Sequence, residues 1–341
     1  MDIIDCASAG AMPQLYRELR QLGLETNIAE LEALGYTVVP PEKVGTPAML
    51  AELCAAFERV MCDRYGNDEA KWHNVNDIQR FILWDDPLFE QLTYNPAGLG
   101  LAQYLVGTNC ILNLCDGWMK GPGDARTGIH ADYLEPSPNA YPEQIANCNV
   151  HYLLTDYSRE DGAISFLPGS HRWRRQVTPP EAKYWADRAV PVEAPAGSMV
   201  IWGHHTWHGS YPRRTPGRRM VLHCEYSRPR YQTQEPFRST VTQEALDRNP
   251  VRFAGLMDVY GPYPFGKNDN VSEHTAFAPP GAGFAQGADK YCSLFDTTPA
   301  RGRVSLRPVI DYQQHDGRMG WERRAALAAE VKAHRSDRPK G

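Results

Sequence analysis

The sequence has no long hydrophobic run, no basic leader and no paired-cysteine motif, and each absence excludes a class of protein. No stretch of about 18 apolar residues occurs, which argues against a membrane-spanning helix. The N-terminus is acidic where a secretory signal is basic, so we expect a cytoplasmic protein. The eight cysteines show no CxxC spacing, which predicts buried free thiols in a reducing compartment.

Low-complexity tracts and internal repeats are also missing, and what remains is the composition of a soluble globular protein. Hydrophobic residues make up 42% and charged residues 23% of the 341 residues, and the net charge is −5. A chain of this length can bury a large core within one domain. We expect a small-molecule substrate and neither nucleic acid nor membrane as a partner; the sequence leaves the oligomeric state open.

The N-terminal third has the apolar spacing of helices. The pattern predicts helices at 15–19, 28–35, 47–64 and 86–106, with Gly35 and Gly107 as stops. Between the second and third of these helices, residues 36–41 predict a short strand that ends at a proline pair. A mostly helical cover over residues 1–108 is therefore expected.

From Cys110 the pattern changes to short β-like runs separated by Gly, Pro, Asn and Asp. Strands are predicted at 110–119, 128–134, 147–154, 163–167, 190–193, 198–203 and 219–226. Short strands with repeated turns indicate a sandwich or open barrel. We expect one mainly β domain with flanking helices, in which residues 109–230 form the β core.

The C-terminal part, residues 231–341, is rich in proline, glycine and aromatic residues. We interpret it as an irregular wrap around the same domain, ending in a surface helix at about 319–334. Residues 255–300 within it could form a lid over a site, although surface loops of this composition are common.

One histidine and one carboxylate stand two residues apart, at His130 and Asp132. In a strand, residues two apart point to the same face, so both side chains would project together. Imidazole plus carboxylate favours a borderline divalent ion such as Fe(II). A pattern this short also occurs by chance as an ordinary surface or core pair.

A third ligand is available further along, where residues 197–210 contain His204, His205 and His208. By composition alone these three histidines are nearly equal candidates. Three ligands on one face of a six-coordinate metal leave the opposite face open for chemistry. The two stretches together point to a non-haem iron oxygenase.

The run 219–226 alternates between a polar and an apolar face. Arg219, Val221, His223 and Glu225 share one face, and its three polar groups need partners if they are buried, as in a ligand-lined barrel interior. An arginine in such an interior suits a carboxylate held by two hydrogen bonds. The alternative is a structural salt bridge from Arg219 to Glu225 or another acid.

In this order, the motifs resemble the phytanoyl-CoA dioxygenase family. The resemblance rests on Thr127-Gly-Ile-His-Ala-Asp132, Asn149 to Asp156, Glu160 to His171, and His208-Gly-Ser210 followed by Arg219. It implies a double-stranded β-helix core, jelly-roll and cupin-like, and dependence on Fe(II) with 2-oxoglutarate and O2 as co-substrates. The related halogenases lack the carboxylate that this chain keeps at Asp132, so halogenation is not expected. Hydroxylation is the expected outcome, and desaturation, epoxidation or ring rearrangement stay open because they depend on how the substrate lies rather than on the ligands.

The resemblance also implies roles for individual residues. The iron ligands would be His130, Asp132 and His208. The distal carboxylate of 2-oxoglutarate would be bound by Arg219 and Ser210, and further contacts with the co-substrate would come from Thr127, Asn149 and His151.

The substrate is predicted only as a class. Four aromatic residues lie close in sequence to the motifs and could line an apolar pocket: Trp118, Tyr133, Trp207 and Tyr211. We expect hydroxylation of a small organic molecule of the lipid-like or secondary-metabolite type, with release of succinate and CO2. The alternatives are a cupin-like metal dioxygenase that does not use 2-oxoglutarate, and a non-catalytic β-sandwich that binds a ligand.

Overall fold

The computed structural model describes residues 8–66, 76–133, 140–229, 231–259 and 293–301. All of them belong to one compact unit, residues 1–305. A second unit, residues 306–341, lies outside the described residues, as do the helix predicted at 319–334 and most of the 255–300 segment. None of the helices in the described ranges combines the length and apolar character that crossing a membrane requires.

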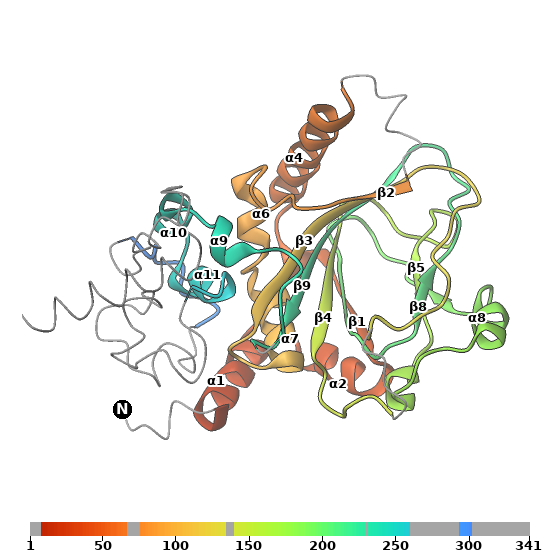
Figure 1. Cartoon of the computed structure of the whole chain (residues 1–341), viewed down its shortest axis with the longest axis horizontal. Coiled ribbons are helices and arrows are strands. Elements are labelled where there is room, and N and C mark those ends of the chain that lie inside the picture. The colour runs from red at the N-terminus through yellow and green to blue at the C-terminus, as the bar shows by residue number, and fades with distance from the viewer. Residues whose placement is uncertain (1–7, 67–75, 134–139, 230, 260–292, 302–341) are drawn as a thin grey trace, which may run out of the picture. The chain divides into compact units, whose positions relative to one another are not determined.

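Two antiparallel sheets form the core (Figure 1). The larger has the order β1 (Tyr36–Val39), β7 (Met199–Gly203), β4 (Asn147–Leu153), β9 (Arg219–Ser227), β3 (Ile111–Lys120), β2 (Asn76–Gln79). The smaller has the order β6 (Val190–Pro191), β5 (Ile164–Phe166), β8 (His208–Ser210). Buried apolar side chains from both sheets, among them Phe166, Trp202 and Val221, pack together between them.

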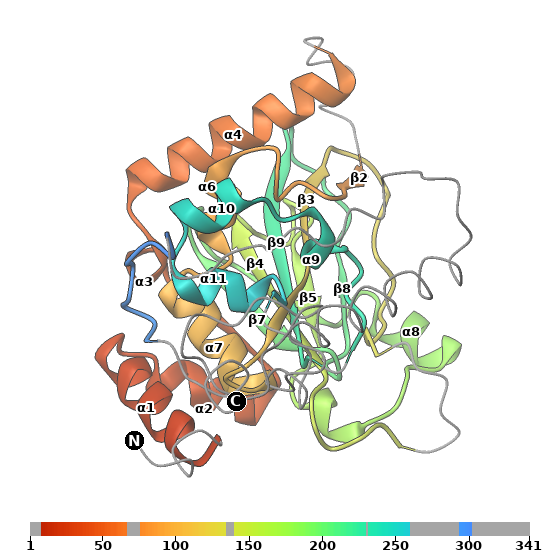
Figure 2. The same cartoon turned by 60° about the vertical axis from the view of Figure 1, so that its left-hand side comes forward.

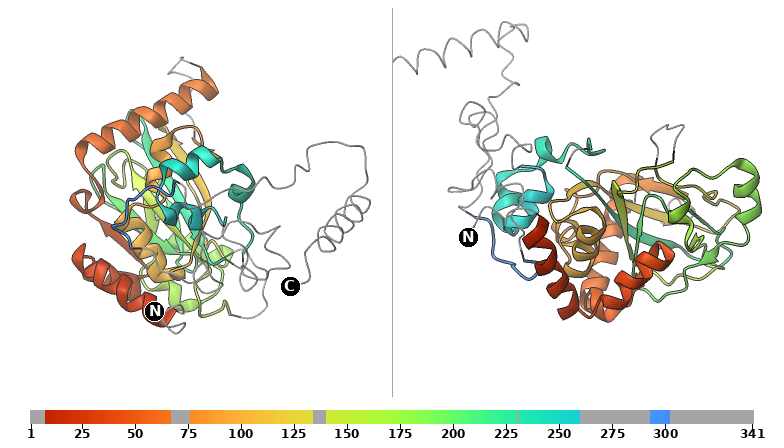
Figure 3. Two further views of the ribbon diagram at one scale, coloured as in Figure 1. Left: turned by 90° about the vertical axis from the view of Figure 1, so that its left-hand side faces the viewer. Right: turned by 90° about the horizontal axis from the view of Figure 1, so that it is seen from below.

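Helices cover the face of the larger sheet that points away from the smaller one. Figure 2 shows α4 (Pro47–Tyr65) and α7 (Pro96–Val106) crossing this face, and α7 contacts β4, β7 and β9. The remaining helices in the described ranges are α1 (Ser8–Gln21), α2 (Glu25–Leu34), α3 (Pro41–Val44), α6 (Pro87–Leu92), α8 (Pro179–Trp185), α9 (Phe237–Thr240), α10 (Gln243–Arg248) and α11 (Val251–Leu256). Figure 3 shows that α8 and the α9–α11 group lie at opposite sides of the sheets. The prediction of a mainly β fold with flanking helices is confirmed.

The placement of α7 follows from its sequence. The Asn95 side chain accepts hydrogen bonds from the backbone N–H groups of Ala97 and Gly98, and Pro96 occupies the first helical position, where it needs no donor. At Gly98 a Cβ would lie 2.4 Å from the Tyr152 hydroxyl. Glycine here therefore lets α7 lie directly on β4.

Several predicted boundaries differ from the structure. Gly35 ends α2 in the left-handed region as predicted (φ 85°), but the single helix predicted at 86–106 is two helices, because Asn95 caps a new one. The strand predicted at 128–134 is wrong: His130 makes only an isolated bridge to His208. His208 in turn lies on β8, a strand that the sequence pattern does not predict.

Candidate metal and co-substrate site

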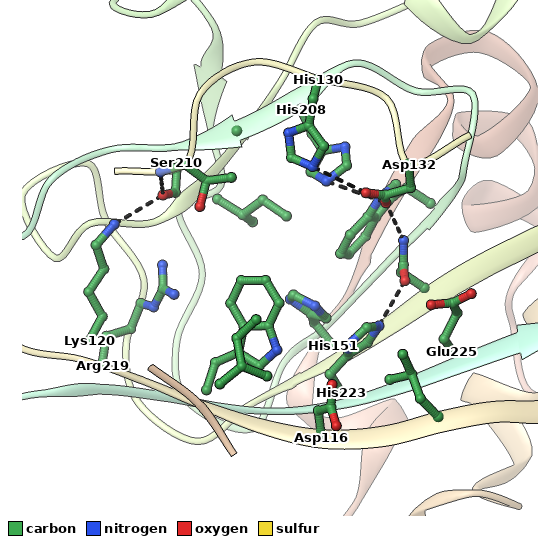
Figure 4. Close-up of a pocket in the computed structure, with 18 of the residues that line it drawn as sticks. Asp116, Lys120, His130, Asp132, His151, His208, Ser210, Arg219, His223 and Glu225 are labelled. Carbon is green, nitrogen blue, oxygen red and sulfur yellow. Dashed lines mark hydrogen bonds and ion pairs between the residues drawn. The ribbon is translucent and has the colours of Figure 1, made fainter. Parts of the chain in front are cut away.

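His130, Asp132 and His208 bring one ligand atom each within 4.8 Å of one another, at the wall of a cavity between the sheets (Figure 4). His130 Nε2 lies 3.1 Å from one Asp132 oxygen and His208 Nε2 lies 3.5 Å from the other. Two backbone hydrogen bonds of 2.9 Å join His130 to His208, and the Asp132 N–H donates to the carbonyl of His204. These bonds, rather than a continuous strand, hold the three side chains together.

Both imidazole rings are oriented by backbone carbonyls. His130 Nδ1 lies 2.8 Å from the Gly128 oxygen, and His208 Nδ1 lies 3.0 Å from the Thr206 oxygen. A ring nitrogen beside a carbonyl carries a proton, so Nε2, which lies next to Asp132, is the nitrogen of each ring that is available as a metal ligand. Burial lowers the pKa of His208 to about 4, which keeps this ring neutral and able to bind a metal.

Two side-chain donors orient the Asp132 carboxylate. Its Oδ2 accepts hydrogen bonds from Asn149 Nδ2 (2.7 Å) and Trp202 Nε1 (3.4 Å). Burial acts to raise the pKa of Asp132, but the neighbouring His208 and the hydrogen bond from His130 outweigh it and hold the pKa well below the usual range. The same carboxylate outweighs the effect of burial on His130 and raises the pKa of that ring. Two imidazoles and an ionised carboxylate converge here, a donor set that suits a borderline divalent cation such as Fe(II).

A second feature of the cavity is a pair of buried cations. Lys120 on β3 and Arg219 on β9 are cross-strand partners, and each is about 5% exposed (6% and 5%). Arg219 donates to the Gly162 carbonyl and lies 4.9 Å from the centre of the Tyr157 ring. Lys120 donates to Ser210 Oγ (3.0 Å) and to the Tyr211 carbonyl (2.5 Å). Neither cation pairs with a carboxylate of the described residues.

Two adjacent buried cations favour an anionic ligand. Burial and the nearby Arg219 charge lower the pKa of Lys120 to about 7. Ser210 Oγ accepts from Lys120 and also from the Thr127 N–H (2.9 Å), so its own proton is left to donate. Lys120, Arg219 and Ser210 therefore present donors to one region of the cavity, as a carboxylate requires.

The cavity has a volume of about 500 Å³. The predicted site residues that line it are Trp118, Thr127, His130, Asp132, Asn149, His151, His208, Ser210 and Arg219. His151 is buried beside Trp118, Trp202 and His223, with its ring centre 4.7 Å from that of His223. Composition alone leaves His204 and His205 open as ligands, and neither belongs to the three-residue cluster.

Tyr133, Trp207 and Tyr211 are not among the residues that line this cavity. Tyr133 packs on Tyr141, Trp207 donates to the Arg175 carbonyl, and Tyr211 donates to the Ala189 carbonyl. Each is the chain neighbour of a cavity residue, and adjacent side chains in extended backbone point to opposite sides. Of the four aromatic residues expected to line a pocket, Trp118 alone lines this cavity.

The salt bridge considered between Arg219 and Glu225 is also absent. Glu225 Oε1 instead accepts hydrogen bonds from Asn113 and Asn147, and lies 3.3 Å from His204 Nε2. The two side chains share one face of β9, as predicted. Their positions are six apart in the sequence, however, which corresponds to a distance of about 20 Å along the strand.

Lys120 is the main site residue that the sequence did not indicate. It follows Asp116 and Trp118 at intervals of two on β3, and all three line the cavity. This period of two is the feature of the sequence that could have placed Lys120 on the same face as Asp116 and Trp118. The approach of Lys120 to Arg219, however, depends on the register between β3 and β9, which one sequence does not reveal.

Comparison with known proteins agrees with this geometry. The family model for phytanoyl-CoA dioxygenase (PhyH) matches residues 31–221, more than half of the chain. The uncharacterized protein Mb1539 of Mycobacterium bovis is 24% identical over 242 residues, which is 67% of this chain and 85% of its own. Dioxygenase af480 of Aspergillus fumigatus is 30% identical over 158 residues, 46% of this chain and 50% of its own.

Among solved structures, HygX from Streptomyces hygroscopicus, determined with nickel and 2-oxoglutarate bound, has a TM-score of 0.52 at 15% identity. The match covers 62% of this chain and 89% of HygX. The two sheets described above are accordingly those of a double-stranded β-helix, as predicted. The chain belongs to the phytanoyl-CoA dioxygenase family and is an Fe(II)- and 2-oxoglutarate-dependent dioxygenase.

Proposed function

We propose that His130, Asp132 and His208 bind the iron, and that Lys120, Arg219 and Ser210 bind the distal carboxylate of 2-oxoglutarate. The observation that carries this proposal is the juxtaposition of two sites on one cavity. One is a three-ligand cluster of two imidazoles and a carboxylate; the other is a buried pair of cations whose described surroundings offer no carboxylate. A dicarboxylate can occupy both sites at once, with one end chelating the metal and the other carboxylate bound by the two cations.

When bound at these ligands, iron would supply the activation of O2, which oxidises 2-oxoglutarate to succinate and CO2 with one oxygen atom and the substrate with the other. The chain's own residues position the groups for this chemistry. Carbonyl contacts at Nδ1 aim both imidazoles, and Asn149 and Trp202 fix the plane of the Asp132 carboxylate. Such supporting contacts raise metal affinity and reduce the reorganisation needed on binding.

The nature of the primary substrate is supported by a relative that binds a small molecule. HygX has also been solved with hygromycin B bound, at a TM-score of 0.50 and 15% identity. This supports a small organic molecule as the substrate here. The proposal further holds that this molecule is hydroxylated by a single oxygenase domain. Thr127, Asn149 and His151 are then the residues that border the co-substrate, Thr127 through its N–H bond to Ser210 and Asn149 through Asp132.

Anaerobic titration tests the assignment of ligands. Addition of Fe(II) and 2-oxoglutarate to the protein should produce a visible metal-to-ligand charge-transfer band. The double variant Asp132→Ala with His208→Ala should show none, while circular dichroism verifies that it is folded. A band that persists in the double variant, or a wild-type protein that binds iron fully without one, would refute the proposal.

A further inference from the structure

The cavity extends beyond the candidate metal ligands to an acid at the far end of β9. Figure 4 shows Arg219 and Glu225 on opposite sides of the site, with His130 and His208 between them. Both ends line the same cavity. If the Arg219 end takes 2-oxoglutarate, the Glu225 end remains for another molecule.

Glu225 is held by only one of its two oxygens. Oε1 accepts hydrogen bonds from Asn113 Nδ2 (2.5 Å) and Asn147 Nδ2 (2.6 Å), and His204 Nε2 lies 3.3 Å from the same atom. Oε2 has no hydrogen-bond partner in the part of the chain that the structure describes. The side chain is nevertheless 5% exposed and forms part of the cavity wall.

The orientation of this carboxylate is built into the fold. Asn113 lies at the irregularity in the β3–β9 register, where an inserted residue turns its side chain to the other strand. Its own oxygen accepts from the Gln234 N–H (2.9 Å), so its NH2 group must face Glu225. The acceptor is therefore preorganised.

Glu225 is charged in this setting. Burial acts to raise the pKa of Glu225, but the neighbouring His204 outweighs it and lowers the pKa. Oε2 is accessible at the cavity wall and is not one of the buried polar atoms that lack a partner. A ligand that fills this end without bringing a donor would leave an ionised oxygen desolvated and unsatisfied, whereas a ligand that brings a donor avoids that cost. Hydroxyl and ammonium groups have this chemistry, whereas a hydrocarbon chain does not.

This acceptor is also close to the candidate metal ligands. Asn149, the cross-strand partner of Glu225, donates to Asp132 Oδ2. The Asn149 residue alone therefore links Glu225 to Asp132, so a group bound at Glu225 lies near the candidate metal ligands. The same end of the cavity is lined by Asp116 and Gln234, which add further polar surface.

From this arrangement we propose that Glu225 Oε2 is a recognition point for the primary substrate and accepts a hydrogen bond from its hydroxyl or ammonium group. The substrate is accordingly a polar, donor-bearing molecule rather than a lipid-like one. This inference rests on the proposed function in one respect: 2-oxoglutarate occupies the Arg219 end.

Three probes of equal shape test it: benzyl alcohol, benzylamine and ethylbenzene. Their dissociation constants are measured by ligand-observed NMR on the protein with Fe(II) and 2-oxoglutarate under anaerobic conditions. We expect wild type to bind at least one polar probe about tenfold or more tightly than ethylbenzene, and Glu225→Ala to lose that preference. Glu235→Gln replaces a buried acid outside the cavity lining and should leave the preference unchanged.

Glu225→Gln separates the two sources of the donor, since it keeps an acceptor oxygen and removes the charge. Preference for the alcohol should survive in this variant, whereas preference for the amine should fall about tenfold or more. The isosteric variant also decides the matter if Glu225→Ala does not fold. Equal affinity for all three probes in wild type, no binding of either polar probe, or a preference that persists in Glu225→Ala overturns the inference.

The charge-transfer band of the same wild-type sample reports separately on the proposed function. If the band is missing, the assignment of iron and 2-oxoglutarate fails. The probe measurement, repeated on metal-free protein, still decides the role of Glu225.

Discussion

Lys120 and Arg219 face each other across β3 and β9 as a cross-strand pair, and both are buried. Like charges directly opposite one another destabilise a sheet. A carboxylate, whose single negative charge is shared by two oxygens, offsets this repulsion. The pair therefore gives the co-substrate end of the cavity a preference for anions that a lone arginine would supply more weakly.

The first prediction concerns the contribution of Lys120. Lys120→Met keeps the length of the side chain and removes its charge and its hydrogen bond to Ser210 Oγ. We expect the KM for 2-oxoglutarate to rise about tenfold or more, with a smaller change in kcat, because a charged hydrogen bond is lost. Lys183→Met on α8, outside the cavity lining, is the matched control. An unchanged KM in Lys120→Met would remove Lys120 from the co-substrate site.

A pH dependence follows from the same residue. Burial and Arg219 lower the pKa of Lys120 to about 7, and a bound carboxylate would raise it again. Binding of 2-oxoglutarate should therefore take up a proton when the pH is above 7. Its affinity should be highest below pH 7 and should fall by up to about tenfold per pH unit above it.

Calorimetry in buffers of different ionisation enthalpy measures this proton uptake directly. Lys120→Met should abolish the uptake at pH 8, while Lys183→Met should not. Proton uptake of equal size in wild type and Lys120→Met would assign the effect to another group.

The third prediction concerns Asn149. Its side chain bridges Asp132 Oδ2 and His223 Nε2, so Asn149→Leu leaves the carboxylate without its main support. The affinity for Fe(II) should drop about 10- to 100-fold, as is common when a supporting contact to a metal ligand is removed. Asn147→Leu on the same strand removes a partner of Glu225 instead and should retain its iron affinity. Competition with a chelator of known affinity provides the measurement, and equal losses in the two variants would contradict the assignment.

How much of this site the sequence predicts depends on how local each relationship is. His130, Asp132, His208 and Arg219 lie in short motifs whose residue types carry the chemistry, so the sequence alone is enough to single them out. It is not enough for Lys120, because the role of Lys120 depends on a strand register between segments about 100 residues apart.

The fold shows the same division. The sequence predicts two helices closely, α2 from the glycine stop at Gly35 and α4 from the helical spacing of its apolar residues. β2 and β8 have four and three residues, too few for a period to be recognised. The segment at 128–134 has the pattern of a strand, but tertiary bonds to His204 and His208 determine its path instead.

The last prediction separates the aromatic residue inside the cavity from one outside it. Trp207 is fully buried beneath the small sheet and donates to the Arg175 carbonyl, whereas Trp118 lines the cavity beside His151 and His223. Trp207→Phe removes a buried ring and its hydrogen bond, so the free energy of unfolding should fall by about 1–3 kcal/mol. The KM for 2-oxoglutarate should change little.

Trp118→Ala is expected to behave in the opposite sense. Its indole Nε1 makes no hydrogen bond within the described residues, and its loss enlarges a cavity that is already open to ligands. The KM for 2-oxoglutarate or the coupling of succinate release to substrate oxidation should change severalfold. Chemical denaturation and succinate release, measured on both variants, provide the comparison. A Trp207→Phe variant with full stability and an altered KM would place Trp207 in the ligand site after all.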